Sequence, residues 1–156
     1  MNRGITFQIP NEYGRFINDI LEPLDCTLYD WLIGNGQILQ VIDDQLIDEE
    51  LFQENETILS GSDLNSRINR NSYYTIFADL KGFPKGKKIS EIKTYEDFLQ
   101  SDCEIALLIT DSIYVSVYCK DLLLLDRLYD NAKSKGYQSV TYISNENDTR
   151  TKMIAW

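Results

Sequence analysis

The sequence predicts an α+β fold with a mainly antiparallel sheet and helices packed on it. Three observations lead to this class: alternating apolar and polar residues over 4–9, two apolar runs close together at 103–109 and 113–119, and an amphipathic helix from Asp121 that ends at Gly136. The chain has 156 residues, of which 43% are apolar and 26% charged. This size and composition are ordinary for a folded protein with one core, so we predict a single domain over residues 1–156.

The first half of the chain is expected to begin with a strand and a short helix. The alternation over residues 4–9 is typical of a half-buried strand. Asn11 can cap the helix that follows, and Pro23 ends it. Two apolar runs, 28–33 and 38–42, then flank the sequence Gly-Asn-Gly, and Asn-Gly between such runs predicts a β-hairpin.

The acid-rich segment 43–56 is predicted to form a short helix. Its apolar residues have helical spacing, which leaves the acids on the outer face. A short strand at Ile58 and Leu59 is expected next, followed by a short helix from Ser62 to about Arg70.

The second half is expected to have the order strand, helix, strand, strand, helix, strand, which is the ferredoxin-like βαββαβ order. Its first strand covers residues 73–80, and a basic loop over 81–93 follows. Thr94 and Asp97 have the spacing of a capping box at the start of a helix. The last strand covers about 138–143.

The two central strands of this half predict their own register, because both apolar faces must be buried together. Ile109 then lies opposite Ile113, and Cys103 lies opposite Cys119. We therefore expect these two thiols to be cross-strand neighbours that stay reduced in the cytoplasm. Cys119 also precedes a helix N-terminus, where a thiol can be activated, but this register turns it into the core as a structural thiol.

The composition excludes several functional classes. The chain has no histidine, which removes the usual zinc ligand sets and the Ser-His and Cys-His nucleophile pairs. No apolar run approaches the roughly 18 residues of a membrane span. The net charge of −10 repels nucleic-acid backbones and anionic lipids. We therefore predict a cytoplasmic protein with no cofactor, no metal, no catalytic residue, and neither nucleic acid nor membrane as a partner.

Two motifs are weaker than they look. Residues 82–88 superficially resemble a phosphate loop, but the glycine spacing is one short and Pro84 removes an amide donor, which favours a solvated loop. The acid pairs within 43–56 lack the spacing and the glycine of a calcium loop, which favours a solvated face or a protein contact.

The negative charge of the protein is confined to one third of it. Residues 16–66 contain twelve carboxylates and neither lysine nor arginine, whereas the rest of the chain sums to +2. The acids are densest in 43–56, which we predict to be a partner-binding surface. Its candidate residues are Asp43, Asp44, Asp48, Glu49, Glu50 and Glu54.

The leading hypothesis is a non-enzymatic protein-binding module, similar to an immunity protein or inhibitor, that docks a basic partner such as a toxin through residues 43–56. The alternative is a small-molecule-binding or enzymatic domain with a cleft lined by tyrosines and carboxylates. A deep pocket with convergent polar groups favours the alternative. The opposite face from the cysteines is expected to carry Tyr114, Ser116 and Tyr118. Helices are expected to cover this second face, or it is left open as an aromatic patch suited to protein contact.

Six segments spread over nearly the whole chain carry a resemblance to a known family. They are GITFQIPNEYG (residues 4–14), WLIG (31–34), FADL (77–80), SDCE (101–104), VYCK (117–120) and ENDTRTK (146–152). Together they resemble a bacterial family of uncharacterised proteins, domain of unknown function 2691. The resemblance implies a single full-length domain and a Gram-positive source. It implies no activity and no catalytic residues.

Overall fold

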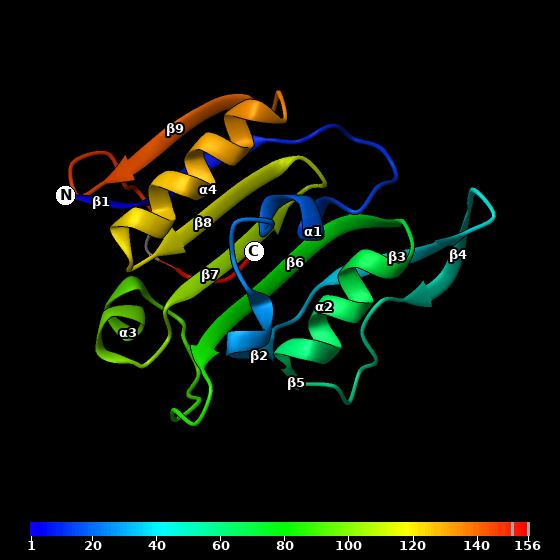
Figure 1. The fold of residues 1–156 in the computed structure, drawn as a ribbon, viewed down its shortest axis with the longest axis horizontal. Helices are drawn as coiled ribbons and strands as arrows, with labels where there is room; N and C mark the ends of the chain where they lie inside the picture. Colours follow the sequence, from blue (N-terminus) through cyan, green and yellow to red (C-terminus); the bar gives the residue numbers. More distant parts are fainter. Residues whose placement is uncertain (151, 156) are drawn as a thin grey trace.

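The computed structural model describes residues 1–150 and 152–155 and has an α+β fold (Figure 1). Over these residues nine strands form one sheet in which every pair is antiparallel. The strands are β1 (Asn2–Gln8), β2 (Tyr29–Ile33), β3 (Gln37–Ile42), β4 (Gln45–Glu50), β5 (Ile58–Ser60), β6 (Tyr73–Pro84), β7 (Ile105–Thr110), β8 (Tyr114–Cys119) and β9 (Gln138–Ser144). The helices are α1 (Phe16–Ile20), α2 (Gly61–Arg70), α3 (Tyr95–Gln100) and α4 (Leu122–Ser134), with a short 3-10 turn, η1 (Cys26–Leu28).

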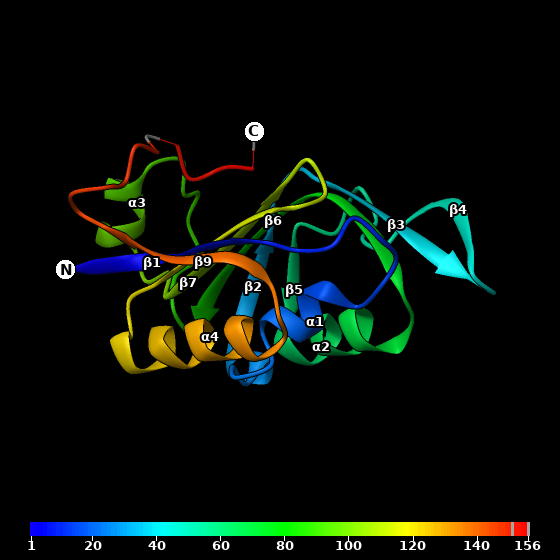
Figure 2. The ribbon, with the colours of Figure 1, turned by 90° about the horizontal axis from the view of Figure 1, so that it is seen from above.

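The strand order is β4-β3-β6-β7-β8-β1-β9; off this path, β2 pairs with β6, and β5 pairs with β2. Helices α1, α2 and α4 cover one face of the sheet, while α3 and the C-terminal segment cover the other (Figure 2). Each face has its own apolar cluster. The alternation of β7 divides its side chains between them, because Leu107 packs toward the three helices and Leu108 toward α3.

The predicted Asn-Gly hairpin is wrong, because β2 and β3 do not pair with each other. Both run antiparallel to β6, β2 along its second half and β3 along its first. The linking residues stay beside β6, since the Gly34 amide donates to the Asp79 carbonyl over 2.8 Å. A Cβ at Gly36 would lie 2.7 Å from the Phe77 carbonyl oxygen. The two glycines therefore allow close approach to β6, and neither has the positive φ of a hairpin turn.

The predicted helix over 43–56 is also wrong, because this segment forms a hairpin with β3. Ile42 pairs with Gln45, and the two residues between them, Asp43 and Asp44, have φ of 52° and 60°. Positive φ at both central residues is the geometry of a two-residue hairpin turn, which aspartate tolerates. The structure of this segment therefore depends more on pairing with β3 than on the helical spacing of its four apolar residues.

The second half follows the expected order along the chain, but its strands are not arranged as in a ferredoxin. There the two strands of each βαβ unit are parallel with another strand between them. β8 and β9 fit this description, with β1 from the first half between them, whereas β6 and β7 are antiparallel neighbours. The capping box of Thr94 and Asp97 and the start of a helix at Asp121 are confirmed, and Asp121 is the N-cap of that helix. The first strand runs on to Pro84, which places Lys81 in the sheet and not in a loop.

The predicted register of β7 and β8 is wrong by two residues, although the faces are correct. Ile109 lies opposite Val115, and Cys119 lies opposite Ile105. The loop is 111–113, where Asp111 and Ser112 turn with positive φ. A shift of two keeps every side chain on its face, so burial alone could not choose between the registers. Cys103 and Cys119 are therefore not cross-strand neighbours. Cys103 precedes β7 and, unlike Cys119, belongs to the apolar cluster of the α3 face, which the predicted shared face did not anticipate.

Candidate functional site

The six predicted contact acids lie on one projecting element, the β3–β4 hairpin with the loop that follows it. We call residues 37–54 the acidic hairpin. Asp43 and Asp44 form its turn, Asp48, Glu49 and Glu50 lie on β4, and Glu54 follows in the loop. All six are exposed. β4 pairs with β3 alone among the described strands, so its outer backbone edge ends the sheet (Figure 1).

The charge of the acidic hairpin is not balanced within the described part of the molecule, where no ion pair includes any of its six carboxylates. Glu56, just beyond it, behaves differently. The Arg67 guanidinium donates to both of its carboxylate oxygens, over 2.7 and 2.5 Å. These hydrogen bonds, with one from the Gln53 amide, lower the pKa of Glu56 to about 2. Glu56 is therefore a structural acid, whereas the six candidate acids remain available.

A groove of about 350 Å³ runs between the acidic hairpin and β6. Glu50 and Glu54 of the candidate set line it, together with Glu56 and Asp79, beside the amide side chain of Asn35. The other four candidate acids are not among its lining residues. The structure thus divides the predicted site into two carboxylates that face a groove and four that lie on the exposed edge and turn.

A second cavity, of about 500 Å³, adjoins this groove and shares Gly34, Asn35 and Asp79 with it. Its floor holds an ion pair in which the Lys81 ammonium donates to the Asp79 carboxylate and to the Met153 carbonyl. Asp79 is 6% exposed and Lys81 3%. Burial raises the pKa of Asp79, and the charge of Lys81 opposes this effect.

Sequence reasoning missed this ion pair because it assigned Lys81 to a solvated loop. The signal was the alternation continuing from Asp79 through Lys81 to Phe83, which keeps all three side chains on the α3 face. The alternative hypothesis expected tyrosines and carboxylates around a cleft. This cavity has two carboxylates, Asp79 and Glu91, but its described lining includes no tyrosine.

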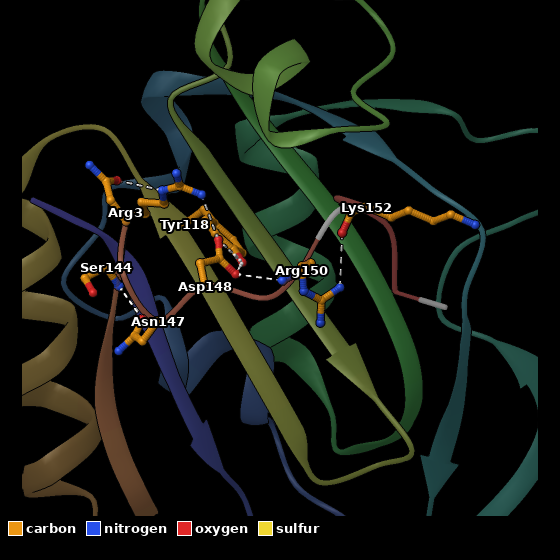
Figure 3. A network of polar contacts seen from close by, with 8 residues as sticks. Arg3, Tyr118, Ser144, Asn147, Asp148, Arg150 and Lys152 are labelled. Carbon is orange, nitrogen blue, oxygen red and sulfur yellow. Dashed lines mark hydrogen bonds and ion pairs between the residues drawn. The ribbon is translucent and has the colours of Figure 1, made fainter.

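Figure 3 shows a polar network that fixes the segment after β9 over the α3 face of the sheet. Arg3 forms an ion pair with Asp148 at 3.2 Å, and the buried Tyr118 hydroxyl donates to the same carboxylate. Arg150 donates to the Ile154 carbonyl over 2.9 Å. Burial, reinforced by Asp148, raises the pKa of Tyr118. The network anchors a loop, and it covers Tyr118, whereas Tyr114 at the far end of β8 remains half exposed.

The three cysteines are free and buried. Burial raises the pKa of Cys26, Cys103 and Cys119 to about 12, which makes each thiolate too scarce to act as a nucleophile near neutral pH. Within residues 1–150 and 152–155, no group of three or more His, Cys, Asp or Glu side chains is placed to hold a metal ion. The helices in these ranges are too short or too polar to cross a membrane.

The fold and surface define a small α+β protein with an acidic, unpaired sheet edge and an adjoining cavity over a buried ion pair. The chain belongs to the family described as "Protein of unknown function (DUF2691)", whose model matches residues 2–154. The uncharacterised protein YncE of Bacillus subtilis (strain 168) is 46% identical to it over 153 residues, which covers 98% of this chain and 99% of the relative. No solved structure matches significantly. The family expected from the sequence is confirmed, and it assigns no activity.

Proposed function

We propose that this protein is a non-enzymatic binding module, similar to an immunity protein or inhibitor, that docks a basic protein partner on the acidic hairpin. The single observation that carries the proposal is the coincidence of two features on β4: a free backbone edge and carboxylates without ion-pair partners among the described residues. Asp48, Glu49 and Glu50 are consecutive on this strand.

The free edge of β4 offers a partner main-chain hydrogen bonds. An extended segment can add to such an edge as a further strand, which supplies affinity, while neighbouring side chains supply specificity. The carboxylates on β4 also discourage a second copy of the same chain, because two acidic edges repel each other. A basic segment meets no such repulsion, so the charge selects the partner.

Electrostatics supports the same assignment. A surface patch of one sign steers an oppositely charged partner and raises the association rate at low salt. The groove beside Glu50 and Glu54 is suited to one basic side chain of that partner, because neither of these two carboxylates has an ion-pair partner among the described residues. A basic toxin such as a nuclease, whose active surface is cationic, is the kind of partner that such a module would block.

The test is affinity capture from the native cell with a charge-reversed variant and a matched control. The variant Asp44→Lys/Glu49→Lys/Glu50→Lys alters the acidic hairpin. The control Glu12→Lys/Asp102→Lys/Asp130→Lys alters three exposed acids elsewhere and carries the same net charge. We expect a basic protein to bind the wild type and the control at low salt and to be lost from the hairpin variant and at high salt. A partner that binds both variants equally contradicts the proposal.

A further inference from the structure

We propose that the 500 Å³ cavity over Asp79 and Lys81 binds a small amphipathic molecule whose head group places a hydrogen-bond donor beside an acceptor, as in an aliphatic amino acid. This site is separate from the edge of β4 and does not depend on the binding function proposed above. It lies on the α3 face, between β2, β5 and β6 on one side and residues 89–93 and 154–155 on the other.

The cavity has the size and lining of a small-molecule site. Such sites commonly enclose about 300 to 1,000 Å³, with mostly apolar walls and a few convergent polar groups. Here the apolar walls include Leu32, Ile89 and Ile154. Ile58 also lines the cavity, and its side chain is 54% exposed. A ligand with a hydrocarbon body would cover it.

The floor of the cavity is chemically specific. Asp79 and Lys81 are two residues apart on one strand, so they present a carboxylate and an ammonium side by side. A buried ion pair is a poor source of stability, because desolvation offsets much of the attraction between the charges. Its position at the floor of an apolar cavity is better explained if the pair also receives a ligand.

Gly34 leaves space beside the Asp79 carboxylate. A Cβ at this position would lie 2.7 Å from Asp79 Cγ, and thus any side chain would crowd the acid. Gly34 does not have a positive φ, so its backbone conformation does not require glycine. The requirement is spatial, because glycine lets the backbone pack closely against the Asp79 side chain at the wall that the cavity and the groove share.

The charges around the cavity select the head group. Asp79 and Lys81 balance each other on the floor, and Glu91 and Lys93 balance each other at the rim, 3.8 Å apart. A lone anion would meet Asp79, and a lone cation would meet Lys81. A head group with both a donor and an acceptor satisfies both side chains, and the aliphatic walls accommodate its body.

The test is a titration of the full ¹⁵N-labelled chain, monitored by amide chemical shifts, with four probes that share a branched hydrocarbon body. L-leucine carries both charges, 4-methylpentanamide carries a neutral donor and acceptor, and 4-methylpentanoate and isopentylamine carry one charge each. We expect leucine or the amide to shift the Gly34, Asp79 and Ala155 signals saturably at millimolar concentration, with about tenfold weaker binding of the single-charge probes. Comparison of leucine with the amide distinguishes a zwitterionic from a neutral head group. Equal binding of all four probes, or no saturable shift up to about 10 mM, overturns the proposal.

Substitutions at Asp79 or Lys81 risk the fold, so the confirming variant is Ile58→Glu at the exposed wall. Its control is Leu123→Glu, which places the same charge on α4, at a side chain that is 73% exposed and lies on the opposite layer (Figure 2). We expect Ile58→Glu to weaken the tighter probe at least about tenfold and Leu123→Glu to leave it unchanged. Equal binding by the two variants contradicts the site.

Discussion

Asp79 and Lys81 place a carboxylate and an ammonium inside the sheet, under the C-terminal segment. Lys81 donates to Asp79 and to the Met153 carbonyl, so one ammonium ties two parts of the chain together. Removing one partner leaves the other charge buried and unpaired, which is far more destabilising than removing both.

A double-mutant cycle tests this coupling. We expect Lys81→Met alone and Asp79→Leu alone each to reduce the free energy of unfolding by about 3 to 5 kcal/mol. The double variant should lie closer to the wild type than either single variant, because it leaves no buried charge. Urea unfolding of the four proteins measures the coupling. Additive losses would show that the two side chains act independently.

The ion pair of Glu56 and Arg67 predicts a pH dependence. The pKa of Glu56 in the folded protein, about 2, lies below its ordinary value of 4.5. The unfolded chain therefore binds this proton more readily, and the stabilisation is present above pH 4.5 and lost as the pH falls toward 2. The pair is partly exposed, so its contribution is about 1 kcal/mol.

The measurement is urea unfolding of the wild type and Glu56→Gln at several pH values. We expect the wild type to be about 1 kcal/mol more stable at pH 6, with the difference shrinking steadily below pH 4.5. The same difference at pH 6 and pH 3 would contradict the assigned pKa.

At the scale of elements, the acidic hairpin depends on a turn at Asp43 and Asp44 and not at Asn35 and Gly36. Asp43 and Asp44 adopt positive φ, where a side chain is strained and glycine is not. Gly36 has its own requirement, because a Cβ there would meet the Phe77 carbonyl at 2.7 Å. Both sites therefore favour glycine over alanine, position 44 because of its positive φ and position 36 because of the space beside β6.

Substitutions at Asp44 test the turn. Glycine and alanine both remove the charge, so the difference between Asp44→Gly and Asp44→Ala reports the backbone alone. We expect the glycine variant to be about 1 kcal/mol more stable. Gly36→Ala should destabilise the protein by about 1 to 3 kcal/mol, because β3 must move away from β6. Thermal unfolding measures both changes, and equal stability of the two Asp44 variants would rule out a positive-φ turn.

Local sequence signals predicted many of the helices and strands. The features that these signals could not predict depend on contacts between residues far apart in the sequence. Thr94 and Asp97 form the expected capping box, and a helix begins at Asp121 as expected, because the start of a helix is set by residues within one turn. Within the segment 43–56, residues 45–50 form a strand because β3 is available to pair with them, which spacing within the segment does not reveal. The register of β7 and β8 was likewise ambiguous by two residues.

For the whole molecule, the charge asymmetry could be predicted from the sequence, but the shape of the candidate site could not. Residues 16–66 hold twelve acids and neither lysine nor arginine, which predicted an acidic surface in this part of the chain. The fold gathers six of these acids on one projecting hairpin. The cavity over Asp79 and Lys81 was not predictable, because residues 32–35, 79–81, 89–93 and 154–155 meet only in the folded chain. The groove beside Glu50 and Glu54 and the cavity nevertheless share one wall, at Gly34 and Asn35.

The most direct test of the proposed function is hydrogen–deuterium exchange with and without the captured basic partner. If the partner docks on the free edge of the sheet, the amides of β4, Gln45–Glu50, exchange more slowly in the complex. The amides of β9, the edge strand at the other end, provide the internal control and should not change. Protection elsewhere on the molecule, with β4 exchanging at its free rate, would contradict the acidic hairpin as the docking surface.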